Sequence, residues 1–133
     1  MQAGAKIPPR NQVVTPMLTE VNESYRGLDY VWGRQAQPPV GEPVAVADGI
    51  WWIRHAMPGA LDHINVWLLE DGDGWTIVDT GLALPDTRAA WEAIFASHLG
   101  GRPVRRVICT HLHPDHTGLA GWLCERFGCE LWM

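Results

Sequence analysis

Six consecutive positions carry most of the chemistry that this sequence can offer. They supply three imidazoles and one carboxylate, from His111, His113, His116 and Asp115. Nitrogen and oxygen donors of this kind suit Zn²⁺ and other borderline first-row metals. In an extended segment alternate side chains share one side, and Pro114 favours an extended backbone at the residue before it. If the chain then turns into a helix, the loop can offer two ligand pairs, His111 with His113 and Asp115 with His116, to two adjacent ions.

The elements around this loop must hold it in place. An apolar strand over residues 104–110 ends directly before it, and an apolar stripe over residues 119–127 predicts a helix after it that Gly128 closes. Pro85 opens an earlier helix, since its missing N–H costs nothing at a first helical position. The helix ends at the glycine pair 100–101.

Three further strands precede the first helix. Residues 50–53 and 65–69 are rich in branched and aromatic side chains, and the sequence Asp-Gly-Asp-Gly at 71–74 predicts a tight turn into a strand over residues 75–78. Strands followed by alternating helix and strand predict an α/β sandwich with helices outside a sheet. The ligand loop then lies at the carboxyl end of a strand, where α/β folds place their sites.

The run His-Leu-His-Pro-Asp-His-Thr-Gly at 111–118 resembles the first metal motif of the metallo-β-lactamase-fold hydrolases. A second similarity is the strand that ends in Asp-Thr-Gly at 79–81, and together the two cover about residues 46–133. The resemblance implies an αββα sandwich in which His111 and His113 bind the first metal and Asp115 and His116 the second. It also implies that Asp79 braces the ligand loop, because a carboxylate behind an imidazole orients the ring and raises its basicity.

The family completes its site with two later histidines and a bridging aspartate, whereas no histidine or aspartate follows His116 here. We therefore expect residues 46–133 to be the N-terminal half of such a domain, and the chain by itself to be an incomplete, inactive fragment. Residues 1–45 are interrupted by prolines. We expect them to be an extension or linker, with one short helical piece near residues 18–25.

The resemblance implies a metal-dependent hydrolase of an ester-like bond, such as a thioester or lactone, acting on a small-molecule acyl substrate. Two Zn²⁺ ions are expected per complete domain, although iron or manganese would also suit the donors. Asp115 is expected to orient the nucleophilic water as well as to bind metal. In this family the first hairpin loop borders the metal cleft, so we expect His63 and Met57 to contact substrate, although His63 fits a surface residue beside a strand equally well.

Composition limits the kinds of partner and the cellular compartment that we expect for this protein. The net charge is −5 and no stretch of Lys and Arg exceeds the pair at 105–106, which argues against nucleic acid. No apolar run is long enough for a membrane span, and the first twenty residues lack the apolar core of a signal peptide. The three cysteines form no disulfide framework, so we expect a reducing, cytoplasmic location.

Other interpretations stay open at this point. The same fold could bind iron and act as an oxygenase, or the chain could be a non-catalytic half domain. The triplet at 79–81 also matches the catalytic triplet of aspartic proteases, which would leave the histidine run unexplained. A zinc site formed by His113 with Cys109, Cys124 and Cys129 is a further alternative, but buried, inert thiols fit better. No residue selects the substrate, the metal or the oligomeric state.

Overall fold

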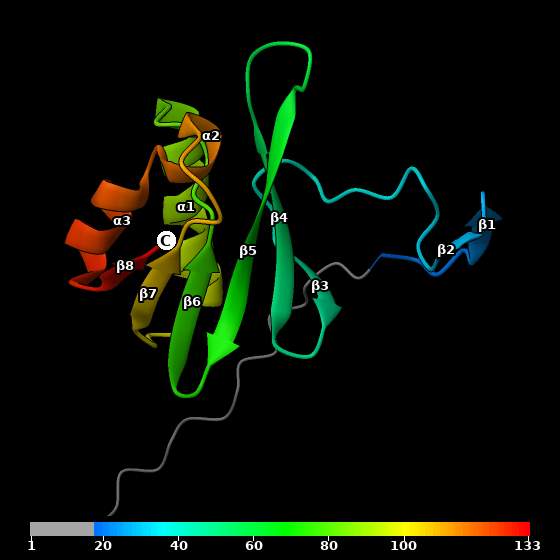
Figure 1. Ribbon diagram of the computed structural model, residues 1–133. Helices are drawn as coiled ribbons and strands as arrows, with labels where there is room; N and C mark the ends of the chain where they lie inside the picture. Colours follow the sequence, from blue (N-terminus) through cyan, green and yellow to red (C-terminus); the bar gives the residue numbers. More distant parts are fainter. Residues whose placement is uncertain (1–17) are drawn as a thin grey trace, which may run out of the picture.

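A computed structural model of the protein describes residues 18–133 as a mixed α/β fold built on a six-stranded sheet (Figure 1). The strands lie in chain order across this sheet: β3 (Val44–Ala47), β4 (Ile50–Ala56), β5 (His63–Asp71), β6 (Gly74–Val78), β7 (Val104–Ile108) and β8 (Glu130–Trp132). The helices are α1 (Pro85–His98), α2 (Pro114–Thr117) and α3 (Ala120–Phe127). A separate hairpin precedes them, formed by β1 (Glu23–Tyr25) and β2 (Leu28–Tyr30). The α/β fold expected from the sequence is confirmed.

Strands β3 to β6 form the antiparallel part of the sheet. In β5 the side chains of Ile64, Val66 and Leu68 are buried, whereas the residues between them are less so. This alternation follows from the two-residue repeat of a strand and sets one face of the sheet against the core. On the opposite face Trp52 and Trp67 stack with ring centroids 6.2 Å apart.

Strands β6, β7 and β8 are parallel, and each connection between them passes through helix. Helix α1 joins β6 to β7, while α2 and α3 join β7 to β8. Phe95 of α1 stacks on Trp122 of α3 with centroids 6.2 Å apart, so the two helices pack side by side against one face of the sheet. The core lies between these helices and the sheet, and it includes Trp91, Leu119 and Leu123, none of which is exposed to solvent.

The turn between β5 and β6 and the helices α1 and α3 lie where the sequence predicts them. The prediction of a short helical piece near residues 18–25 is wrong. Strand β1 occupies part of that stretch and pairs antiparallel with β2. The residues between them, Arg26 and Gly27, have φ angles of 52° and 78°. Two consecutive positive φ angles define the turn that best matches the twist of a hairpin.

The sheet starts slightly ahead of the expected boundary at residue 46, because β3 begins at Val44 and Val40 bridges to Arg54. The division into a linker over residues 1–45 and a domain after it stays a prediction, and residues 1–17 lie outside the described part of the chain. Within residues 18–133 no helix combines the length and apolarity that crossing a membrane requires.

Candidate metal centre

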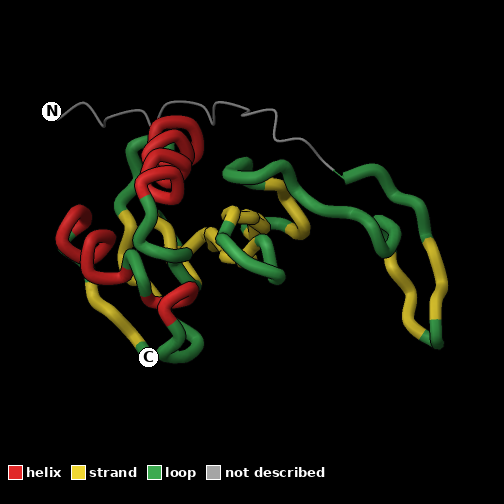
Figure 2. The backbone as a smooth tube through the Cα atoms, turned by 90° about the horizontal axis from the view of Figure 1, so that it is seen from above, coloured by secondary structure: helices red, strands yellow, loops and turns green. Residues whose placement is uncertain are grey.

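The predicted ligand loop connects β7 to α2, at the carboxyl ends of the parallel strands (Figures 1 and 2). His113 is extended, with φ −64° and ψ 143°, and Pro114 is the first residue of α2. The extended backbone before proline and the turn into a helix after it are both as the sequence predicts. The turn brings the rings of His111 and His116 to 3.9 Å between centroids.

The two predicted ligand pairs are adjacent in space. Nε2 of His111 lies 3.2 Å from Nδ1 of His113, and Nε2 of His116 lies 3.4 Å from a carboxylate oxygen of Asp115. A tetrahedral Zn²⁺ with ligands at its usual bond lengths separates two of them by about 3.3–3.4 Å. Each pair therefore has the spacing at which both donors could bind one ion.

Asp79 lies behind His116. Its Oδ2 is 2.8 Å from Nδ1 of His116, and its side chain is almost fully buried. A carboxylate can only accept, so Nδ1 of His116 carries the proton of this hydrogen bond. In the neutral ring Nε2 then carries a lone pair and can bind a metal ion, whereas in the protonated ring its N–H donates to Asp115. This geometry matches the bracing role predicted for Asp79, which stays a prediction.

Thr110 also contacts this network, although nothing in the sequence analysis singled it out. Its backbone N–H donates to Oδ1 of Asp79 at 2.8 Å, and its hydroxyl lies 2.9 Å from Oδ2 and 3.0 Å from Nδ1 of His111. With Nδ1 of His111 engaged there, Nε2 of that ring is directed to His113. The sequence signal that could have indicated this role is the position of Thr110, directly between the strand and the first histidine.

Thr80 joins the end of β6 to the ligand loop and was likewise missed. Its hydroxyl donates to the carbonyl of His116 at 2.8 Å and accepts from the N–H of Leu119 at 3.0 Å, while its own N–H donates to the same carbonyl at 2.9 Å. The carbonyl of Thr80 accepts from the indole of Trp91 at 2.8 Å. Thr80 is fully buried, so these bonds fix the loop to the core.

Gly118 allows the ligand loop and the loop that follows β6 to approach each other closely. A Cβ at this position would lie 2.6 Å from the carbonyl oxygen of Pro114 and 2.8 Å from that of Gly81. Both atoms belong to the backbone, so neither can give way easily. The glycine after the histidine run is therefore required by packing between the loops.

Side chains in the described part of the chain do not by themselves complete a metal site. Within residues 18–133 no three His, Cys, Asp or Glu side chains are arranged to hold one ion. Burial, and then the charge of Asp79, raise the pKa of the Cys109 thiol to about 11. The Sγ of Cys109 donates to the carbonyl of His116 at 3.6 Å. The donors of the loop lie in two pairs, His111 with His113 and His116 with Asp115.

The protease interpretation of the triplet at 79–81 does not suit this geometry. Both carboxylate oxygens of Asp79 accept hydrogen bonds, from Thr110 and from His116. The side chain is also only 6% exposed, which leaves neither oxygen free to contact a substrate.

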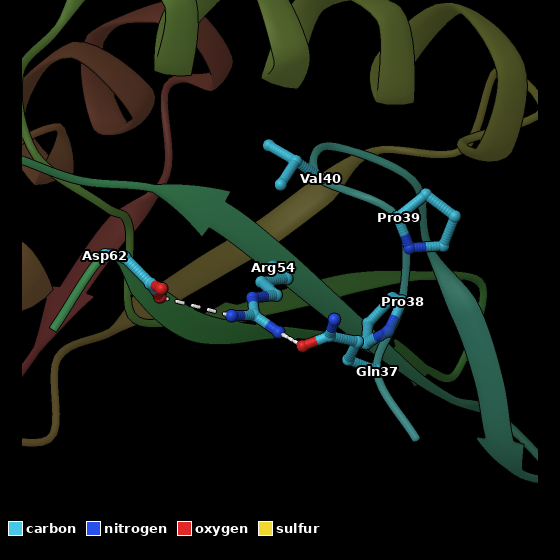
Figure 3. A pocket seen from close by; sticks show the side chains of 6 residues that line it. All are labelled: Gln37, Pro38, Pro39, Val40, Arg54 and Asp62. Atoms are coloured by element: carbon cyan, nitrogen blue, oxygen red, sulfur yellow. Dashed lines mark hydrogen bonds and ion pairs between the residues drawn. The ribbon is translucent and has the colours of Figure 1, made fainter. Parts of the chain in front are cut away.

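The hairpin between β4 and β5 carries the two residues that we expect to contact substrate. Nδ1 of His63 lies 2.8 Å from a guanidinium nitrogen of Arg54, and Met57 packs partly buried against the core. Arg54 also forms an ion pair with Asp62 and a hydrogen bond with Gln37. A pocket of about 360 Å³ is lined by these three residues together with Pro38, Pro39 and Val40 (Figure 3). The structure thus ties His63 to an ion cluster at the hairpin, and its contact with substrate stays a prediction.

The fold, the ligand loop and the buried Asp-Thr-Gly turn together point to one protein family. Residues 59–133 match the family described as the metallo-beta-lactamase superfamily. The chain belongs to this superfamily. Proteins of this fold generally bind divalent metals such as zinc.

Relatives of this chain include two named thioesterases. The human acyl-coenzyme A thioesterase MBLAC2 is 29% identical over 83 residues, which are 56% of this chain and 29% of that protein. The atrochrysone carboxyl ACP thioesterase dmxR1 of Cryptosporiopsis sp. (strain 8999) is 30% identical over 95 residues, which are 68% of this chain and 28% of that protein. The chain thus spans less than a third of the length of these relatives, and the hydrolase character is common to them.

Solved structures agree with this assignment. A beta-lactamase domain protein from Burkholderia ambifaria is 48% identical with a TM-score of 0.66, covering 74% of this chain and 31% of that one. The metallo-β-lactamase FIM-1 of Pseudomonas aeruginosa, in its mono-zinc form, has a TM-score of 0.54. At 24% identity over 67% of this chain and 39% of its own, FIM-1 supports the fold alone.

Proposed function

We propose that the protein is a dizinc hydrolase of an ester-like bond, a thioester or a lactone. The observation that carries the proposal is the spacing of the two donor pairs, 3.2 Å between His111 and His113 and 3.4 Å between His116 and Asp115. Both match the separation of two ligands on one tetrahedral ion. The buried Asp79 behind His116 supports it further, because such a carboxylate sets the tautomer of a ligand histidine.

Each residue of the loop has a distinct task in this proposal. His111 and His113 hold one ion, and His116 and Asp115 hold the other, with Asp115 also accepting a hydrogen bond that orients the attacking water. The ions, when bound, supply an activated water and Lewis acidity at the acyl carbonyl. Catalytic zinc usually takes three protein ligands. We therefore propose that each ion also binds further donors that do not belong to these four residues.

The substrate class rests on the named relatives. Two of them are thioesterases, and a third, from Bacillus subtilis (strain 168), is a probable metallo-hydrolase. We propose a small acyl compound as substrate, with His63 and Met57 of the hairpin in contact with it. The negative net charge gives no reason to expect a nucleic acid.

Metal content and turnover test the proposal together. The full-length protein, loaded with zinc, should bind close to two ions and hydrolyse a thioester or a lactone. His111→Ala and Asp115→Ala should each lose metal and activity, because each removes one donor of a pair. His98→Ala is the matched control, since that histidine lies at the end of α1 and bonds to Ser97. Equal metal content and turnover in all four proteins would overturn the proposal, and a coloured protein that holds iron would favour an oxygenase.

A further inference from the structure

Two cysteines lie near the end of α3, Cys124 within the helix and Cys129 just after it. Gly128 has a φ of 61° and terminates the helix, and its N–H donates to the carbonyl of Cys124. The N–H of Cys129 reaches the same carbonyl at 3.2 Å. In this type of helix ending the residue after the glycine folds back toward the residue five positions earlier, and a contact between their side chains is frequent.

The backbone bond limits how far apart the two residues can be. With standard bond lengths, an N···O distance of 3.2 Å leaves at most about 7 Å between the Cα atoms of Cys124 and Cys129. Disulfides form at Cα separations of about 4.4–6.8 Å. The side chain of Cys124 is also near enough to the Cys129 thiol to help raise its pKa.

Access separates this pair from the third cysteine. Cys124 and Cys129 are half-buried, whereas Cys109 is 2% exposed. A small reagent in solution can therefore reach the pair while Cys109 stays covered. All three thiols are free in the structure.

We propose that Cys124 and Cys129 form a dithiol modification site that a low-molecular-weight disulfide, such as oxidised glutathione, converts to an intramolecular disulfide. The thiolate of Cys124 attacks one sulfur of the reagent and releases one glutathione thiolate, which takes up a proton. The thiolate of Cys129 then attacks the mixed disulfide at Cys124 and releases the second glutathione. The two protein sulfurs are oxidised by two electrons in total, and the reagent is reduced to two thiols.

The environment of Cys129 determines how this exchange behaves. Burial, and then the neighbouring Cys124, raise the pKa of the Cys129 thiol to about 11. Little thiolate is present at neutral pH, so the second step is slow and accelerates as pH rises. A thiol of high pKa is also a poor leaving group, so the finished bond resists reduction. The bond would join the end of α3 to β8, which begins at the next residue, Glu130.

Differential alkylation tests this site. The folded protein is incubated with excess oxidised glutathione at pH 8, alkylated, and mapped by peptide mass spectrometry. We expect one disulfide between Cys124 and Cys129 with Cys109 still free, the same bond in Cys109→Ser, and no intramolecular bond in Cys124→Ser. Mapping of the unsubstituted protein gives the answer even where a variant fails to fold. Three alkylatable thiols after oxidation, a bond that includes Cys109, or a bond that forms only in urea would overturn the proposal.

Discussion

His55 makes the stability of this fold depend on pH. It lies on β4, is 1% exposed, and its ring packs 5.1 Å from the ring of Trp91. Its Nε2 is buried and makes no hydrogen bond within residues 18–133. Because burial disfavours the charged ring, the pKa of His55 falls from 6.5 to about 4.

The size of the effect follows from linkage. The folded state holds His55 neutral, whereas the unfolded chain protonates it as the pH falls through 6.5. The unfolded state thus binds more protons, and stability is lost on acidification. Between pH 7 and pH 5 the free energy of unfolding should fall by about 2 kcal/mol from this residue, and by about 3 kcal/mol in total below pH 4.

Urea denaturation followed by tryptophan fluorescence measures this loss, and the eight tryptophans give a strong signal. His55→Leu removes the titrating group, so the fall in stability between pH 7 and pH 5 should be smaller in that variant by about 2 kcal/mol. Other groups titrate equally in both proteins and cancel in the difference. If both proteins lose the same stability, or if NMR titration shows His55 protonating near pH 6.5 in the folded state, the reasoning is wrong.

Three further predictions concern the loops. Thr80→Val should lower the free energy of unfolding by about 1–3 kcal/mol, because it leaves a buried N–H without its acceptor, and urea denaturation checks this. Gly118→Ala should be destabilising, because its Cβ would lie 2.6 Å from a backbone oxygen. Gly121→Ala in α3 meets nothing within 4 Å and should stabilise the fold by about 0.5–1 kcal/mol. The melting temperatures of the two variants should therefore shift in opposite directions. Asp79→Asn should weaken zinc binding about 10–100-fold, measured by competition with a chelator, because the amide no longer draws the proton of His116.

Much of the fold was predictable because the signals were local. Pro85 marked the start of α1, Gly128 the end of α3, and the glycine-rich turn at 71–74 the hairpin from β5 to β6. The prediction failed near residues 18–25, where part of the expected helical piece is strand β1. The pair Arg26 and Gly27, which forms the actual turn, does not have the usual asparagine or aspartate before its glycine.

The candidate site was predictable only in part. The histidine run identified its own donors, and the resemblance pointed to Asp79. The roles of Thr110 and Thr80 depend on contacts between residues 31 and 36 positions apart, which no local pattern encodes. A threonine is also compatible with a strand, a turn or a surface, so its type alone carries little information.

The change from antiparallel to parallel pairing at β6 has a consequence for the order of folding. The β4–β5 and β5–β6 pairs are hairpins that close over short loops, but pairing Ile77 with Val107 requires all of α1 to be in place between them. Closing the longer connection costs more chain entropy, and contacts of high sequence separation form slowly. The contacts between Thr80 and His116 can form only after that closure. We therefore expect the ligand loop to gain protection from hydrogen exchange after the antiparallel strands, so that the chemistry-bearing part of the molecule is among the last to become ordered.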